Sequence, residues 1–216
     1  MSHTRDAYHH GDLRNALIAS AVRLIEQGGE AAFSLREAAR DVGVSANAAY
    51  RHFDDKTALL TAAATGGLER MSALMQSAMD RAAKSRGKKS LAIARFTAVG
   101  RAYVEFALAH PELFRLIFSG SGVGCLDHDA PGLVTPTPWE LLGRSLDALV
   151  AEGVLPPERR AGAELKAWSV VHGFASLALA GHAAVPTGGE LAMALESALE
   201  FAVRGLCATD EHDRRR

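Results

Sequence analysis

Apolar residues recur at the spacing of an α-helix along almost the whole chain. Leu13, Leu17 and Ile25 mark the apolar face of a first helix over residues 12–27, and two glycines directly after it predict its end. The same period predicts eight further helices, over about residues 35–41, 45–53, 54–79, 90–109, 111–118, 138–152, 157–184 and 190–208. No stretch alternates with the period of a β-strand, and no segment repeats. The pattern therefore predicts an all-α protein of about nine helices.

The second and third of these helices are short, and Gly43 stands between them. Ser34 lies three residues before Glu37, which is the spacing of a capping box, and Ser45 occupies the capping position of the third helix. Because glycine adopts a left-handed turn without a steric penalty, the segment predicts a helix-turn-helix. Its expected inner contacts are Ala38, Val42, Val44, Ala49 and Phe53, with the small Ala39 where the helices cross.

The side chains that this core does not need suit contacts to DNA. Asn47 can read an adenine edge, and Arg51 can donate to a guanine or a phosphate. Lys56, in the first turn of the fourth helix, can grip a phosphate together with the free N–H groups of that helix. Arg5 stands on an arm before the first helix and can reach a phosphate or the minor groove. The predicted DNA contacts are Arg5, Ser34, Ser45, Asn47, Tyr50, Arg51, His52, Lys56 and Thr57.

Composition neither supports nor opposes this interpretation. The chain has 216 residues, is 48% hydrophobic and 23% charged, and carries a formal net charge of −1, so no overall basicity indicates nucleic acid. A helix–glycine–helix corner also occurs in all-α proteins that never touch DNA. Spacing and charge alone therefore leave both DNA binding and a purely structural corner open.

Two segments, "HHGDLRNALIASAVRLIEQGG" and "FSLREAARDVGVSANAAYRHFDDKTALL", resemble the N-terminal domain of the tetracycline-repressor-like (TetR) family of bacterial transcriptional regulators. The similarity covers about residues 9–64. It includes the helix lengths, the turn at Gly43, the aromatic–histidine cluster before residue 54, and Lys56. The chain departs from the family at Ala48-Ala49, where many members have Thr-Leu or Ser-Leu. Where other members use the Thr or Ser hydroxyl to contact a phosphate, Ala48 of this chain lacks that contact.

The segments "HPELFRLIFSG" and "AWSVVHGFASLALAG" resemble, more weakly, a C-terminal subgroup named for a Trp-His-Gly (WHG) signature, which falls on Trp168, His172 and Gly173. The resemblance implies a DNA-binding domain over 9–64, a ligand-binding and dimerisation domain over 65–208, and flexible tails at 1–8 and 209–216. It also implies a homodimer on a palindromic DNA operator, formed through the helices over 157–184 and 190–208. A small effector molecule inside the C-terminal domain would release the repressor from its operator.

An effector pocket is expected around the Trp-His pair. Trp168 and His172 are four residues apart and share one helix face. An apolar cavity with a few polar groups is typical of small-ligand sites, which favours a hydrophobic or aromatic effector. The predicted lining is Phe96, Tyr103, Phe106, Phe114, Trp139, Trp168 and His172. The alternative is that these aromatic residues form the core and that His172 is a hydrogen-bonded structural histidine.

No cofactor, metal or catalysis is predicted. The two cysteines, Cys125 and Cys207, form no CxxC pair. Cys125, together with Asp127, His128 and Asp129, resembles a metal or nucleophile cluster but lies in a loop without a partner motif. The chain has no nucleophile–base pair and no phosphate loop, so an enzyme or a metal-dependent sensor is the weaker alternative. A helical interaction or sensor protein that has lost specific DNA binding stays open.

Residues 167–189 contain no charged side chain and are long enough to span a bilayer. Two histidines, several glycines and Pro186 interrupt them, so burial against the core and a partner subunit is the preferred interpretation. The polar N-terminal segment "MSHTRDAYHHGDLR" is unlike a signal peptide. The sequence thus predicts a cytoplasmic protein that does not enter a membrane.

Overall fold

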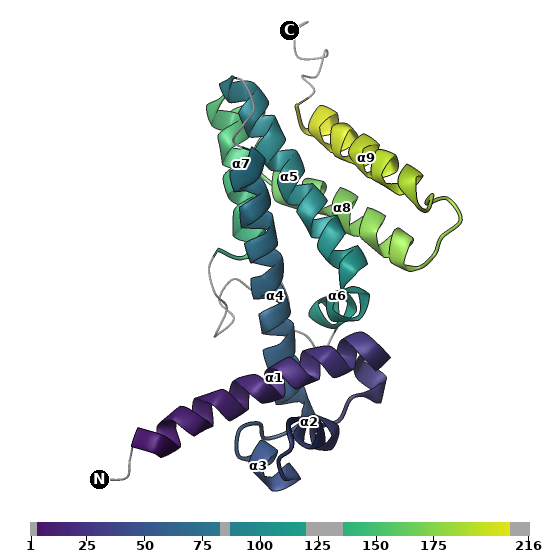
Figure 1. Cartoon of the computed structure of the whole chain (residues 1–216). Coiled ribbons are helices and arrows are strands. Elements are labelled where there is room, and N and C mark those ends of the chain that lie inside the picture. Colours follow the sequence, from purple (N-terminus) through teal and green to yellow (C-terminus); the bar gives the residue numbers. More distant parts are fainter. Residues whose placement is uncertain (1–3, 83–86, 120–135, 208–216) are drawn as a thin grey trace, which may run out of the picture. The chain divides into compact units, whose positions relative to one another are not determined.

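Nine α-helices make up the described part of the chain, which contains no strand (Figure 1). The computed structural model describes residues 4–82, 87–119 and 136–207, with side chains from residue 13 onward. A short 3₁₀ turn, η2 (Pro157–Arg159), precedes α8. The α-helices are α1 (Thr4–Ala32), α2 (Leu35–Val42), α3 (Ala46–Tyr50), α4 (Lys56–Arg81), α5 (Lys88–Ala109), α6 (Pro111–Phe118), α7 (Pro138–Ala151), α8 (Ala163–Leu179) and α9 (Gly189–Cys207). The predicted all-α fold is confirmed.

The chain divides into two compact units. The first holds residues 1–70 and 110–134, so that α6 joins α1, α2, α3 and the beginning of α4. The second holds residues 71–109 and 135–216, with the rest of α4, α5, and α7 to α9. The packing of α6 against α1 explains why α6 belongs to the first unit. The predicted domains over 9–64 and 65–208 are a functional division, and they remain predictions.

The helix α1 is longer than the sequence predicted. It begins at Thr4 rather than at residue 12, because polar residues continue the helix although they add nothing to its apolar stripe. It is broken at Gly29, whose backbone angles (φ 72°, ψ 176°) are not helical, but a last turn follows to Ala32. The glycine therefore interrupts the helix as predicted without being its last residue.

The predicted helix over 157–184 is also wrong at both ends. Pro157–Arg159 forms a separate 3₁₀ turn, and Gly162, with φ 70°, stands between that turn and α8. The helix stops at Leu179, two residues before Gly181, which has φ 63°. Residues 180–184 contain no charged side chain, so the hydrophobic pattern did not mark the C-terminal end of the helix.

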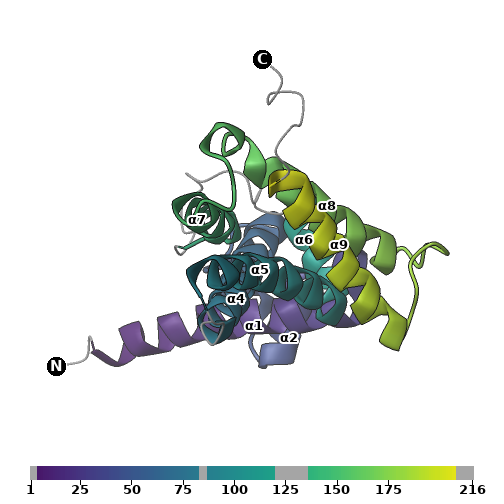
Figure 2. The same cartoon turned by 90° about the horizontal axis from the view of Figure 1, so that it is seen from above.

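The second compact unit is organised around α5, which contacts α7, α8 and α9. Figures 1 and 2 both show α8 and α9 lying side by side and running in opposite directions. Gly100 allows α5 to lie close to both. A Cβ atom there would come within 2.7 Å of Leu199 Cδ2 on α9 and 3.2 Å of Val171 Cγ1 on α8. One core cluster in this unit consists of Ala92, Phe96, Leu142, Leu146, Leu149, Leu155, Ala163, Ala167, Ala202 and Leu206.

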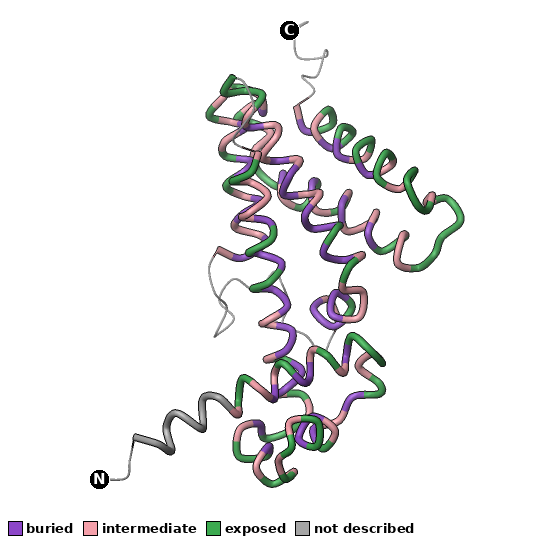
Figure 3. The backbone as a smooth tube through the Cα atoms, viewed as in Figure 1, coloured by how far each residue is buried: buried purple, intermediate pink, exposed green. Residues whose placement is uncertain are grey.

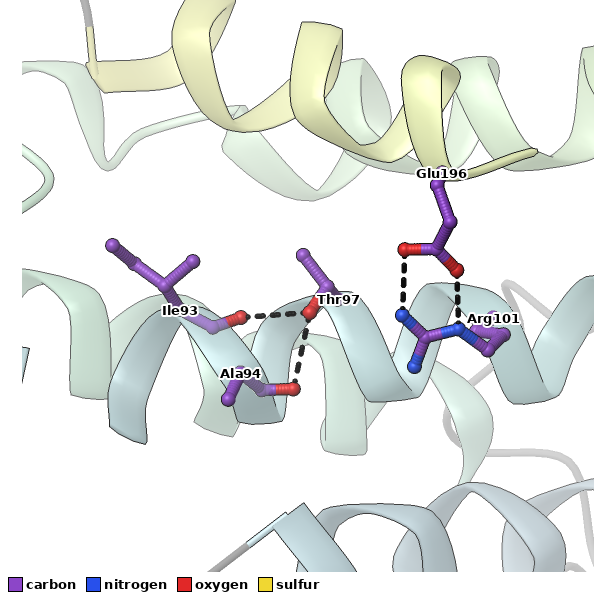
Figure 4. A network of polar contacts seen from close by, with 5 residues as sticks. All are labelled: Ile93, Ala94, Thr97, Arg101 and Glu196. Atoms are coloured by element: carbon purple, nitrogen blue, oxygen red, sulfur yellow. Dashed lines mark hydrogen bonds and ion pairs between the residues drawn. The ribbon is translucent and has the colours of Figure 1, made fainter. Parts of the chain in front are cut away.

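Next to this glycine, Arg101 joins α5 to α9 through a two-pronged ion pair (Figure 4). Its Nε donates to Glu196 Oε1 at 2.6 Å, and its second guanidinium nitrogen donates to Oε2 at 2.8 Å. The hydrogen bonds from Arg101 lower the pKa of the Glu196 carboxyl. Matched forks of this kind fix geometry as well as adding attraction, so the pair helps to hold α9 on α5.

In the first compact unit, Gly67 allows α4 to pack closely against α6, as Gly100 does for α5 in the second unit. A Cβ atom there would lie 3.0 Å from Ile117 Cδ1 and 3.0 Å from Leu113 on α6. The neighbouring Gly66 has nothing within 4 Å of such an atom. Glycine weakens a helix interior by about 1 kcal/mol relative to alanine, yet α4 continues through both glycines. Gly67 serves close packing.

Candidate functional site

The helix-turn-helix begins at α2, whose N-terminus is capped by Ser34. The Ser34 hydroxyl accepts from the Glu37 backbone N–H at 3.2 Å and lies 2.9 Å from the Glu37 carboxylate. The helix ends at Gly43, which has φ 81° and ψ 25°, a left-handed conformation that glycine adopts without strain. Its N–H donates to the Arg40 carbonyl at 3.1 Å. Both the cap and the turn glycine were predicted, and both are confirmed.

The third helix starts immediately after this turn. The Ser45 hydroxyl accepts from the Ala48 N–H at 3.2 Å, which confirms its predicted capping role. The side chains under α2 and α3 are small or aromatic, and Ala38, Ala39, Ala49 and Phe53 are all buried. Because these residues anchor α3 on its inner side, its outer side is held in a fixed orientation.

Polar contacts of Asp41 at the end of α2 add to this core, and no pattern along the chain predicted them. Asp41 accepts hydrogen bonds from Ser20 and Arg23, both on α1. The hydrogen bond from Ser20 is the main cause of a pKa of Asp41 below its ordinary value, and Arg23 adds to this effect. Since the partners are 21 and 18 residues away along the chain, only the packed structure brings them together.

Five predicted DNA contacts are exposed, four on α3 or its caps and one at the start of α4. Tyr50 is 46% exposed although it is aromatic, and Ser45, Asn47, Arg51 and Thr57 are exposed as well. Ser45, Asn47, Tyr50 and Arg51 lie on α3 or at its two caps, and Thr57 lies in the first turn of α4. Their amide, guanidinium, phenol and hydroxyl groups can donate to base edges and to phosphate oxygens. The structure thus leaves these groups available to a partner.

The other four candidates are placed differently. Ser34, His52 and Lys56 are partly buried. Ser34 is used by its capping bonds, and the Lys56 ammonium donates to the Glu30 carbonyl oxygen at 2.9 Å. Arg5 lies within α1 rather than on an arm before the first helix as predicted, and its side chain lies outside the described residues. DNA contact by all nine residues remains a prediction.

In the second compact unit, four of the seven predicted pocket residues meet in one cluster. Trp168 Nε1 donates to the Tyr103 hydroxyl at 3.0 Å, and this hydroxyl lies 2.8 Å from His172 Nδ1. The rings of Trp139 and Trp168 meet edge to face with their centres 6.3 Å apart. Since an indole N–H only donates, the Tyr103 oxygen accepts the hydrogen bond from Trp168. The Tyr103 hydroxyl can then donate a hydrogen bond to His172 Nδ1.

His172 is half-buried in this cluster, and burial lowers its pKa below the ordinary histidine value. A neutral imidazole whose Nδ1 accepts from Tyr103 fits this direction. The hydrogen-bonded histidine is one of the alternatives that the sequence left open, and it does not exclude a ligand beside the cluster.

The other three predicted pocket residues, Phe96, Phe106 and Phe114, are all buried. Phe96 lies in the core cluster described above, and Phe106 is fully buried. Phe114 belongs to the first compact unit, where its ring lies 4.7 Å from that of Phe118. A residue that the sequence did not single out is Ser72, on the part of α4 in the second unit. Its hydroxyl is buried and has no hydrogen-bond partner among the described residues.

The second unit also exposes large apolar side chains on its last two helices. Leu165 and Leu177 on α8 are 57% and 46% exposed, and Met193 and Phe201 on α9 are 67% and 68% exposed. Exposed positions run along the whole of α9 (Figure 3). Large apolar groups that gather on neighbouring helices are typical of an interface with another protein.

The described residues contain neither a candidate metal-binding cluster nor a candidate membrane-spanning helix. The cluster Cys125, Asp127, His128 and Asp129 lies outside the described residues. Among the residues that are described, no group of three His, Cys, Asp or Glu side chains could hold a metal ion. No helix in the described ranges is long and apolar enough to cross a membrane. Burial raises the pKa of the Cys207 thiol, which makes it less reactive.

A capped helix-turn-helix whose second helix exposes Asn47 and Tyr50 has the arrangement of a DNA-binding motif. Two family models agree. Residues 17–63 match bacterial regulatory proteins of the tetR family, and residues 96–202 match the tetracyclin repressor-like C-terminal domain. The chain belongs to the TetR family of transcriptional regulators. Regulators of this family are non-enzymatic proteins that bind operator DNA as dimers.

Solved structures share the fold. A protein of unknown function from Rhodococcus sp. RHA1 is 33% identical, with a TM-score of 0.73 over 93% of this chain and 98% of its own. A TetR-family transcriptional regulator from Pectobacterium atrosepticum is 21% identical, with a TM-score of 0.61 over 95% and 98%. A TetR family transcription regulator from Marinobacter aquaeolei VT8 is 17% identical, with a TM-score of 0.60 over 94% and 100%. A search among curated proteins found no match. The Trp-His-Gly subgroup remains a prediction.

Proposed function

We propose that the protein is a homodimeric repressor that leaves its operator when a small hydrophobic or aromatic molecule binds. The observation that carries the DNA-binding part is the exposed polar face of α3, held from beneath by Ala49 and Phe53. Asn47 and Arg51 are the base-reading candidates on this face, and Tyr50 is a phosphate contact. The Ala48-Ala49 departure removes one hydroxyl, and the exposed donors that remain on this face are Asn47, Tyr50 and Arg51.

The dimer is proposed to form through α8 and α9. Their four large exposed side chains, Leu165, Leu177, Met193 and Phe201, would otherwise remain in water. Burying apolar area contributes about 25 cal/mol per Å², so covering these side chains favours association. A symmetric dimer presents two recognition helices to a palindrome whose half-sites are about 34 Å apart, one turn of DNA.

The effector is proposed to bind beside Trp139, Tyr103, Trp168 and His172. The cluster combines flat apolar rings with a phenol and an imidazole, which suits an aromatic molecule with one polar group. On DNA, the two DNA-binding domains of the dimer must have a particular spacing, and an effector that favours another spacing lowers the affinity for the operator. Because the coupling is reciprocal, DNA lowers the affinity for the effector by the same factor.

Fluorescence anisotropy tests the proposal. Genomic fragments selected by the purified protein would be titrated beside scrambled duplexes at two salt concentrations. We expect nanomolar, sequence-dependent binding with two protomers per site. Equal, weak and salt-sensitive binding to both duplexes would favour a helical protein that has lost specific DNA recognition.

With an operator in hand, aromatic compounds are screened by the loss of anisotropy that they cause. Trp168→Ala should abolish the response to an active compound and leave DNA binding of the free protein unchanged. If Trp168→Ala instead responds normally to the compound, the effector binds elsewhere.

A further inference from the structure

A groove lies between α1 and α4 in the first compact unit, and neither the helix-turn-helix nor the effector cluster uses it. It has a volume of about 560 Å³ and is open to solvent. The small or apolar side chains in its walls are Ile18 and Ala19 on α1, and Ala58, Ala62 and Gly66 on α4. Small side chains allow another helix to approach these walls closely.

No contact among the described residues requires the glycine at position 66. A Cβ atom on Gly66 would meet nothing within 4 Å, whereas one on the neighbouring Gly67 would press on α6. Glycine weakens a helix interior relative to alanine, yet α4 continues through this position. Ala58, Ala62 and Gly66 follow at intervals of four residues and form one row on the helix. A backbone that approaches this row from outside the chain accounts for the glycine.

Opposite charges stand at the two ends of this groove. Arg14 on α1 lies at the end near the start of α4, since its guanidinium carbon is 5.1 Å from the centre of the Phe53 ring. Glu69 on α4 lies at the other end, eleven residues beyond Ala58 and therefore about 16 Å further along the helix axis. Both side chains are exposed, and neither forms an ion pair among the described residues. Both charges are therefore available to a partner.

This arrangement of charges is self-complementary. When a second copy of the groove is laid over the first about a two-fold axis, Arg14 of each copy meets Glu69 of the other. A small ligand would instead need an anionic and a cationic group about 16 Å apart. The Thr65 hydroxyl in the wall already donates to the Thr61 carbonyl oxygen at 2.9 Å, so it seeks no acceptor from a ligand. The groove therefore favours a second copy of this chain over a small molecule.

The extent of the groove indicates a weak contact that acts on DNA. Ten residues line it, whereas a stable interface takes about 20–30 residues from each partner. A weak contact becomes effective when neighbouring operators hold two dimers close together, because the local concentration is then high. The half-sites of one operator are about 34 Å apart, whereas packed helices lie about 8–10 Å apart. The partner on DNA therefore belongs to a neighbouring dimer.

We propose that the α1–α4 groove joins the first compact units of neighbouring dimers and makes binding to adjacent operators cooperative. The inference rests on the proposed DNA-binding function and goes beyond it, because it assigns a second, weaker interface besides α8 and α9. Exposed ion pairs add little attraction. The main effect of Arg14 and Glu69 is therefore to select which ends of the two grooves meet.

Mobility-shift titrations of the full-length protein test the inference on duplexes with one selected operator or two, whose separation is varied in single base pairs over one turn. The ratio of the affinities for the second and the first dimer measures cooperativity, and a change in DNA affinity itself cancels in this ratio. We expect the second dimer to bind about ten-fold tighter at the best separation. Arg14→Glu and Glu69→Arg should each reduce the ratio to about one. The two changes together should restore it, because both ion pairs form again with exchanged charges.

Two further variants calibrate the result. Lys89→Glu reverses an exposed charge of the second unit and should leave the ratio unchanged. Gly66→Leu fills the groove without a change of charge, so it should abolish cooperativity and leave the affinity for a single operator unchanged. Circular dichroism checks that each variant is folded.

Three outcomes would overturn the inference. The wild-type protein could show no cooperativity at any separation. Cooperativity that survives both single charge reversals would arise from deformation of the DNA and not from the groove. A folded double variant that stays non-cooperative would show that Arg14 and Glu69 do not pair. Failure of the proposed function looks different, because the wild-type protein would then bind no single operator, and the role of the groove on DNA would be rejected with it.

Discussion

The first compact unit exposes a short polar helix, α3, whereas the second exposes large apolar side chains along α8 and α9. The polar face occupies a helix of 5 residues, and its place is set locally by the Ser34 and Ser45 caps and by the left-handed Gly43. The apolar face extends over helices of 17 and 19 residues and depends on area. A face that reads DNA needs few groups in fixed places, whereas a face that joins two subunits needs many apolar atoms.

The largest expected effect comes from disrupting the apolar face. Phe201→Asp combined with Met193→Asp places two charges in the proposed interface, where they lose hydration without gaining partners. We expect a monomer in sedimentation analysis and operator affinity weakened about 100-fold or more, because two linked half-sites are no longer bound together.

Leu74→Asp is the matched control for this pair, since Leu74 on α4 is 41% exposed but lies outside α8 and α9. It should remain dimeric and bind the operator normally. If the double variant remained dimeric, α8 and α9 would not form the interface.

Changes to the polar face rank second. Asn47→Ala and Arg51→Ala each remove an exposed donor of α3 and should cost about 1–3 kcal/mol of discrimination between the operator and variants with one altered base pair. Competition titrations with single-base variants measure this loss. A uniform weakening on all sequences would mean that the altered side chain contacts only phosphate.

Packing changes at the glycines of α4 rank third. Gly66→Ala should stabilise the protein by up to about 1 kcal/mol through helix propensity, since a Cβ atom meets nothing there. In Gly67→Ala the new Cβ would press on Leu113 and Ile117, and overpacking costs about 1–3 kcal/mol. The second variant should therefore unfold at lower urea than the first, as measured by circular dichroism. Equal midpoints would show that α6 moves away at no cost.

The smallest effects concern pH, and they should appear at different pH in the two units. His172 is held neutral, so its unit loses stability as the pH falls below about 6.5 and through the lowered folded pKa. The hydrogen bonds that Asp41 accepts favour its charged form in the folded protein. The stability that they contribute is present above about pH 3.8 and is lost as the pH falls through the lowered folded pKa of Asp41.

The urea midpoint of unfolding is measured as a function of pH. His172→Gln should remove only the loss of stability below about pH 6.5, and Asp41→Asn only the loss below about pH 3.8. Both tryptophans, Trp139 and Trp168, belong to the second unit, so their fluorescence reports its unfolding. Circular dichroism reports both units. If both variants changed the same limb of the profile, the assignment of the two groups would be wrong.

Sequence by itself determined the features that depend on neighbours along the chain. The helical period gave the all-α class, the Ser34–Glu37 spacing gave the start of α2, and Gly43 gave the turn. These features were predictable because a cap, a left-handed glycine and an amphipathic stripe act over three or four residues. The position of α3 in the recognition motif followed from them.

Only the tertiary structure decided which distant groups meet. Phe114 appeared equivalent to the pocket aromatics, yet it packs with Phe118 in the first unit, whereas Tyr103 joins Trp168 and His172 across 65 and 69 residues. The Lys56 ammonium donates to the Glu30 carbonyl oxygen, 26 residues earlier along the chain, while its phosphate contact remains a prediction. The physical reason is that a helical pattern shows which side of a helix is buried, but the partner depends on how the helices pack.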